Sequence, residues 1–261
     1  MKKIIYITYC ILIFFSVPSQ ALEGREVMKK VLNAFYYQGK DQGAKAHMEI
    51  TDQQGRQRTR DLALLRRNTN DGDGRQKYYV YFKGPSDIKK MAFMAWKNVT
   101  RDDDRWLYLP ALDLVKRIAA SDERTSFVGS HFFYEDVSGR SLEKDVHQLV
   151  DENKKYYIVK SKAKNPETVE FSSYQVWVDK KTFLPIKIEY YNSNNVMYRV
   201  YQTLKFDLID GFPTITTAQM EDKISGGKTT IEYSSIRYSL GIPENVFSER
   251  YLRKAPKKYL K

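Results

Sequence analysis

Short strand-like segments follow one another along most of this chain, and they constrain its fold more than any other feature. Residues 46–50 alternate apolar and polar side chains, and a Gly-containing turn separates them from a second run at 56–66, which predicts a β-hairpin. Turn residues separate further strand candidates, which lie at residues 78–82, 88–96, 106–109, 156–160, 174–178, 186–191, 197–206, 214–220 and 229–238. This even spacing predicts an antiparallel sheet that is curved or partly closed.

Two segments depart from the strand pattern. Residues 24–38 carry apolar side chains at helical spacing and are followed by Gly39, which predicts one amphipathic helix. Residues 124–140 are long, apolar in the middle and interrupted by glycines, and they predict a lid or a short helix. The chain has no repeat of fixed spacing and no low-complexity linker, so we expect residues 22–261 to form a single domain.

The N-terminus has the three parts of an export signal. Two lysines precede an apolar run at residues 4–17, which ends before Pro18 and the small residue Ala21. The run is shorter than the roughly 20 apolar residues of a membrane-spanning helix, so we expect a cleavable signal peptide at residues 1–21. Cys10 is the single cysteine and lies inside this run, which excludes disulfides and thiolate chemistry from the mature chain.

The formal net charge of the chain is +12, spread along the sequence rather than gathered in one block. Outside the cytoplasm nucleic acid is not an expected partner. An anionic membrane surface or an acidic protein would be attracted by this charge, and an ordinary soluble basic surface is the alternative interpretation.

The sequence lacks a recognisable catalytic or metal-binding constellation. Its three histidines, His47, His131 and His147, do not lie at metal-ligand spacing. Ser130 follows a glycine and precedes a histidine, but the second glycine of a nucleophile elbow is missing, so a structural loop is favoured. The acidic run at residues 102–104 is typical of a solvated turn between strands. We therefore predict no enzyme activity, no metal and no cofactor.

One stretch resembles a known family. The motifs that carry the resemblance are WLYLPA at 106–111, VKRI at 115–118, SFVGSHFFYED at 126–136, VWVD at 176–179, LP at 184–185 and DGFP at 210–213. They resemble the outer-membrane lipoprotein-sorting family, in the superfamily of LolA/LolB-like periplasmic lipoprotein carriers. The family has an acidic residue after Gly-Ser where this chain has His131. The resemblance implies a mainly β (α+β) fold, in which a strongly curved antiparallel sheet forms an unclosed barrel with helices or a lid on its concave side.

The resemblance also implies a function. Such a protein would bind lipid or lipoprotein acyl chains in an apolar cavity, because exposing acyl chains to water costs about 0.8 kcal/mol per CH₂. It would be a periplasmic carrier that works as a monomer between membranes, with an inner-membrane exporter or an outer-membrane acceptor as its partner. The alternatives are an envelope-stress sensor that uses the same cavity, and a hydrolase that uses Ser130 and His131.

Aromatic and methionine side chains in the central motifs are the candidate cavity lining, and they are Met91, Phe93, Met94, Trp96, Trp106, Tyr108, Phe127, Phe132 and Phe133. Strand alternation puts Met91 and Phe93 on one face and Met94 and Trp96 on the other, so not all of them can line one cavity. Ordinary core packing is the alternative for each. Arg117 is the candidate contact to a lipid head group or a partner, or an ion-pair partner of Asp136.

Overall fold

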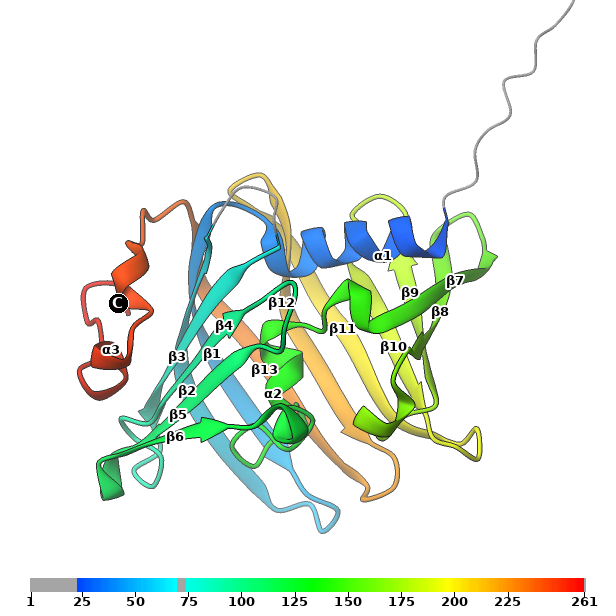
Figure 1. The fold of residues 1–261 in the computed structure, drawn as a ribbon. Coiled ribbons are helices and arrows are strands. Elements are labelled where there is room, and N and C mark those ends of the chain that lie inside the picture. Colours follow the sequence, from blue (N-terminus) through cyan, green and yellow to red (C-terminus); the bar gives the residue numbers. More distant parts are fainter. Residues whose placement is uncertain (1–22, 70–73, 261) are drawn as a thin grey trace, which may run out of the picture.

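The computed structural model describes residues 23–69 and 74–260, so the predicted signal peptide lies outside the described residues. Its centre is a 13-stranded antiparallel sheet (Figure 1). The strands are β1 Asp41–Thr51, β2 Gln57–Asn68, β3 Gln76–Gly84, β4 Ala92–Lys97, β5 Asp104–Leu109, β6 Leu114–Ile118, β7 Asp145–Glu152, β8 Tyr156–Ala163, β9 Ser173–Asp179, β10 Pro185–Tyr191, β11 Met197–Ile209, β12 Phe212–Asp222 and β13 Gly227–Tyr238.

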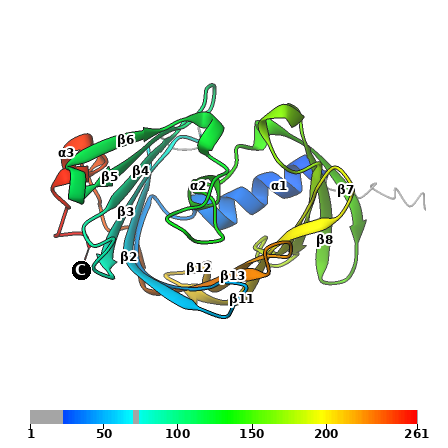
Figure 2. The same ribbon diagram turned by 90° about the horizontal axis from the view of Figure 1, so that it is seen from below.

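Strands that are consecutive in sequence pair with each other, except β6 and β7, and one further pairing is long-range. The order is β6-β5-β4-β3-β2-β1-β13-β12-β11-β10-β9-β8-β7, so β13 pairs with β1 and joins two meanders into one sheet. β6 and β7 are the two free edges, and the sheet curls without closing, as the view from below shows (Figure 2). The predicted fold, a strongly curved and unclosed antiparallel sheet, is confirmed.

The helices are short. α1 (Gly24–Leu32) continues into the five-residue π-helical turn η1 (Asn33–Tyr37) and crosses the concave side, where α2 (Tyr134–Ser138) also lies (Figures 1 and 2). α3 (Glu249–Arg253) packs outside the sheet, against β4 and β5. The 3₁₀ turns are η2 Pro110–Leu112, η3 Ala120–Asp122, η4 Leu142–Lys144, η5 Pro166–Thr168 and η6 Glu244–Val246. In the described ranges no helix combines the length and the apolar character needed to cross a membrane.

Most predicted strands are present, and the differences have local causes. The strand predicted at 88–96 begins only at Ala92, because Lys90 has φ +72° and its N–H donates to the Phe82 carbonyl in a tight turn. The edge strands β6 and β7 were not among the predicted strands. Both are largely exposed. β7 is mostly polar, and the five residues of β6 do not alternate because Lys116 and Arg117 are adjacent, so neither strand has the apolar alternation of a covered strand.

The sheet buries apolar side chains on both faces. On the concave face, the main core gathers under α2 and η1 and contains Phe82, Phe93 and Phe127. A second core on the opposite face of β3 and β4 is covered by the C-terminal segment, which we define as residues 240–260. A third core lies between α1 and strands β8 to β10. The sheet therefore separates the apolar cores of its concave face from the core beneath the C-terminal segment.

Candidate functional site

A mainly apolar cavity lies on the concave side of the sheet and has a volume of about 140 Å³. Leu62 and Leu64 on β2 reach it because strand residues two apart point to the same face, and Ala218 and Met220 on β12 reach it in the same way. The cavity is also lined by aromatic residues from outside the sheet, which are Phe35, Tyr36, Phe127 and Phe132. Its surface is mainly apolar, which suits an apolar ligand.

The loop at residues 123–140, here called the plug, covers this cavity. Phe127 is buried at its tip, with its ring centroid 5.7 Å from that of Phe82 and 5.4 Å from that of Phe93. The Phe127 N–H donates to the Phe132 carbonyl at 2.7 Å, which closes a tight turn. Gly129 has φ +77° in that turn, a conformation that glycine adopts without strain. The turn thereby holds Phe127 and Phe132 together against the cavity.

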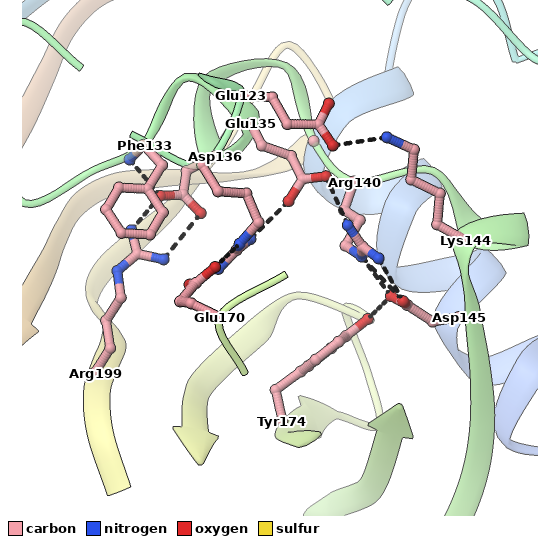
Figure 3. Close-up of polar contacts among 12 residues, drawn as sticks. Glu123, Phe133, Glu135, Asp136, Arg140, Lys144, Asp145, Glu170, Tyr174 and Arg199 are labelled. Carbon is pink, nitrogen blue, oxygen red and sulfur yellow. Dashed lines mark hydrogen bonds and ion pairs between the residues drawn. The ribbon is translucent and has the colours of Figure 1, made fainter. Parts of the chain in front are cut away.

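A buried ionic network fixes the plug from within (Figure 3). Glu135, at the start of α2, accepts hydrogen bonds from Arg124 at 2.6 Å and from Arg140 at 2.9 Å. Burial alone would raise the pKa of the Glu135 carboxyl, but Arg140 and Arg124 outweigh it and lower this pKa to about 2. The carboxylate is therefore ionised throughout the neutral range and holds both ends of the plug.

The same network ties the plug to the strands (Figure 3). Arg124 also donates to Glu170 at 2.6 Å, and Arg140 donates to Asp145 on β7 at 2.8 Å. On the other side Asp136 forms an ion pair with Arg199 on β11. The sequence does not predict this network. Its partners lie up to 63 residues apart, and charged residues in a loop are usually solvated.

The depressed pKa of Glu135 has a consequence for acid stability. A group whose folded-state pKa is below its ordinary value of 4.5 contributes stability that is complete above pH 4.5 and is lost as the pH falls towards 2. We expect the wild type to lose stability in this window and the Glu135→Gln variant to lack that part of the loss. Urea unfolding between pH 6 and pH 2.5 would measure the difference, and parallel pH curves would contradict it.

Ser130 and His131 do not form a nucleophile and base pair. The Ser130 Oγ accepts from the backbone N–H of Phe132 at 3.2 Å, whereas the His131 Nδ1 lies 2.8 Å from the Thr229 Oγ1 on β13. Burial lowers the pKa of His131. His131 joins the plug to β13, because its backbone N–H and its ring Nδ1 both hydrogen-bond to the Thr229 Oγ1. The hydrolase alternative receives no support from this geometry.

The acidic run before β5 is bound by basic side chains. Asp103 accepts from Arg105 at 2.8 Å, and Asp104 forms ion pairs with Arg101 and Arg117. The interpretation of this run as a solvated turn is therefore wrong for Asp103 and Asp104, which are largely buried in ion pairs. Across the described ranges, three or more His, Cys, Asp or Glu residues do not gather in a way that could hold a metal ion.

The predicted lining residues on the concave side form one group. Phe127 and Phe132 line the cavity. Met91 and Phe93 belong to the core behind it, where the Phe93 ring packs on Phe127. Phe133 contacts charged groups instead, since the Arg199 guanidinium lies 3.8 Å from its ring centroid. Whether any of these side chains touches a lipid stays a prediction.

The other predicted lining residues lie on the opposite face. Met94, Trp96, Trp106 and Tyr108 pack in the core beneath the C-terminal segment, and the Trp96 and Trp106 ring centroids are 5.0 Å apart. Strand alternation is the reason, since it turns these side chains away from Met91 and Phe93. They do not line the concave cavity. The lining residues that were not predicted include Leu62, Leu64, Ala218 and Met220, whose spacing of two along β2 and β12 was the available signal.

Arg117 does not contact Asp136, and that predicted pairing is wrong. Arg117 is exposed on the edge strand β6 and pairs with Asp104, while Asp136 pairs with Arg199. Each of the two residues is held by another strand, because Arg117 on the edge strand β6 pairs with Asp104 on the neighbouring strand β5, and Asp136 pairs with Arg199 on β11. A contact of Arg117 with a head group or partner stays a prediction.

Known proteins resemble this chain in sequence and in fold. A family model described as a "-like: Uncharacterized protein" family matches residues 74–254, more than half of the chain. No curated protein matches the sequence. An outer membrane lipoprotein-sorting protein domain from Vibrio parahaemolyticus is similar in structure, with a TM-score of 0.78 and 27% identity, over 88% of this chain and 98% of that chain.

Two further solved structures share the fold. A DUF1329 family protein from Desulfovibrio piger has a TM-score of 0.81 and 24% identity, over 88% of this chain and 97% of that chain. A LolA superfamily protein from Nitrosomonas europaea has a TM-score of 0.69 and 17% identity, over 88% of this chain and 100% of that chain. The chain therefore belongs to the family that the matching model describes, and it shares its fold with an outer membrane lipoprotein-sorting protein domain and a LolA superfamily protein.

Proposed function

We propose that this protein is a periplasmic carrier that binds the acyl chains of a lipid or lipoprotein in its concave cavity and moves them between membranes. The observation that carries the proposal is the apolar cavity between the sheet, η1 and the plug. Acyl chains cost about 0.8 kcal/mol per CH₂ in water, so a carrier must enclose them. The predicted signal peptide and the LolA-like fold support the same function.

The cavity must enlarge to hold a whole chain. Its volume of about 140 Å³ is close to that of an engineered apolar cavity of about 150 Å³ that accepts benzene. A lipid with two or three acyl chains needs several times this space. The concave cavity would therefore have to widen before the proposed carrier could enclose such a lipid.

A second, smaller cavity would supply the additional space. It has a volume of about 70 Å³ and lies between α1, the plug, β9 and β10. The two cavities share the lining residues Phe35 and Tyr36 of η1, together with Asp136, Ile188 and Tyr190. π-helical turns are rare and often occur at functional sites. Because η1 lines both cavities, a shift of this turn would join them. Flexible Met48 and Met220 side chains would adapt to the chain.

We expect native mass spectrometry of protein purified from its own envelope to detect a bound lipid with one or more acyl chains. The Phe132→Asp variant should lose it, because a carboxylate in the apolar cavity wall brings water to the chain. The matched control is Phe206→Asp on β11, where the phenylalanine is 42% exposed and outside the cavity lining. Thermal melts of both variants would check that they are folded.

A transfer assay separates the carrier from a sensor. A carrier loaded from donor vesicles should deliver labelled lipid to acceptor vesicles, which represent the proposed outer-membrane acceptor, whereas a sensor would retain it. An inner-membrane exporter would be the donor in the cell. Protein that stays empty after purification and takes up no lipid from vesicles would contradict the proposed function.

A further inference from the structure

One wall of the cavity carries a buried arginine. Arg66 lies on β2, two residues beyond Leu64, and it is 3% exposed. Its neighbours across the sheet are Gln42 on β1 and Tyr78 on β3, and all three residues line the cavity. The cavity therefore has a cationic group in an otherwise mainly apolar wall.

The guanidinium of Arg66 is only partly satisfied. Its Nε donates to the Gln42 Oε1 at 2.9 Å, and its Nη2 donates to the Gln38 carbonyl. Its Nη1 is shielded from solvent and has no hydrogen-bond partner within the described residues. Five buried side-chain atoms in the described part of the chain lack a partner, and the Arg66 Nη1 is the one that belongs to a cavity-lining residue.

Arg66 also lacks an ion-pair partner among the described residues, in contrast to Arg124 and Arg199, which are paired with carboxylates. The nearby Asp41 is already engaged, because its carboxylate accepts from the backbone N–H groups of Leu240 at 2.6 Å and Ile242 at 3.0 Å. Burial lowers the pKa of Arg66, which reflects the cost of this enclosed charge, but a guanidinium remains protonated. An anion in the cavity would offset that cost.

The other charged group in the lining is already compensated. Asp136 pairs with Arg199 and also accepts from the Phe133 N–H. Arg66 is therefore the charged lining residue, in the part of the chain that the structure describes, that still has donor capacity to offer. Guanidinium groups bind carboxylates and phosphates through parallel hydrogen bonds, and such charge-assisted bonds are about twice as strong as neutral ones.

We propose that Arg66 is the anion-binding end of the cavity and that the preferred ligand is an amphiphile with one acidic head, a carboxylate or a phosphate. The inference rests on the proposed function and narrows its ligand class. The head would take the unbonded N–H of Arg66, and the chain would extend past Leu62 and Leu64 towards Phe127 and Phe132. A neutral amphiphile would leave the buried charge of Arg66 without an anionic partner and would bind less tightly.

Calorimetric titration of the purified protein with oleate, oleyl phosphate, oleyl alcohol and inorganic phosphate tests the inference. We expect both anionic amphiphiles to bind at least about 10-fold more tightly than oleyl alcohol, as hydrogen bonds to a charged group predict. Arg66→Met should weaken the binding of both by about 10- to 100-fold and leave oleyl alcohol within about threefold. Arg66→Lys, which keeps the charge but not the planar fork, should retain part of the preference. Arg56→Met is the control, since it removes a 76% exposed arginine outside the cavity lining.

The outcomes are distinct. Equal affinity of the wild type for oleate, oleyl phosphate and oleyl alcohol would overturn this inference and leave the carrier function standing, and this comparison does not depend on the folding of any variant. Inorganic phosphate that binds as tightly as oleyl phosphate would also overturn it, because the site would then recognise free phosphate. No binding of any amphiphile would overturn both the inference and the proposed function.

Discussion

Replacing Glu135 with glutamine should lower the free energy of unfolding by about 3–5 kcal/mol, the usual cost of removing one partner from a buried ion pair. Glu135 is 2% exposed and bonds to both Arg124 and Arg140. Without its charge these two buried guanidinium groups would repel each other, although Glu170 and Asp145 would still hold one of them each. The substitution keeps the size of the side chain, so the loss would measure charge rather than packing.

The control for this prediction is an exposed glutamate in the same part of the chain. Glu143 pairs with Arg25, but its side chain is 55% exposed, so Glu143→Gln should cost about 0–1 kcal/mol. Urea denaturation at pH 7 measures both values. Similar small losses in the two variants would contradict the idea that the network holds the plug, and would also remove a reason to expect a stable closed state.

A loss of this size would have a functional consequence. The plug covers the cavity and is tied to β7, β11 and the segment that holds Glu170. Removing the charge of Glu135 should make Phe127 and Phe132 more mobile. A ligand would then enter and leave the cavity faster. We expect the weakened plug to shorten the lifetime of a lipid complex, because the covering residues belong to the same loop as Glu135.

The sequence predicts the strands of the sheet better than it predicts the residues of the site. The hairpin of β1 and β2 and the strands β8 to β13 were predicted correctly because alternation and turn residues are local signals. The pairing of β1 with β13 joins segments that are far apart in the sequence, so no local signal predicts it. The curvature of the sheet was predicted from the strand spacing and the family resemblance. The edge strand β6 was not predicted because it has only five residues and its apolar and polar side chains do not alternate.

The site was predicted less well, for a physical reason. Alternation correctly separates Phe93 from Met94, but it does not say which face is concave. That depends on what covers each face, and the cover of the second face is the C-terminal segment, about 150 residues further along. The charges of the plug were equally out of reach, because Asp136 and Arg199 are joined only by the folded sheet. Ion pairs between distant segments leave no periodic signal in a sequence.

Replacing Phe247 with alanine should lower the free energy of unfolding by about 3–5 kcal/mol, because a large side chain would leave a cavity in a packed core. Phe247 is 1% exposed and lies over Met94 and its neighbours in the core beneath the C-terminal segment. Its carbonyl accepts from the Trp96 Nε1 at 2.9 Å, so the segment is fixed by both packing and a hydrogen bond. The matched control is Phe206→Ala, which should change stability by about 0.5 kcal/mol or less, since Phe206 is exposed.

The same variant separates the two faces of the sheet. Trp96 and Trp106 lie beneath the C-terminal segment, so their fluorescence should shift to longer wavelength in Phe247→Ala as water reaches them. Lipid binding by the folded variant should stay unchanged, because Phe127 and Phe132 line the cavity on the opposite face. A lipid affinity that falls together with the tryptophan signal in protein that is still folded would instead place the acyl chain on the face of Trp96 and Trp106. That result would restore the sequence-based lining there and reject the concave cavity as the binding site.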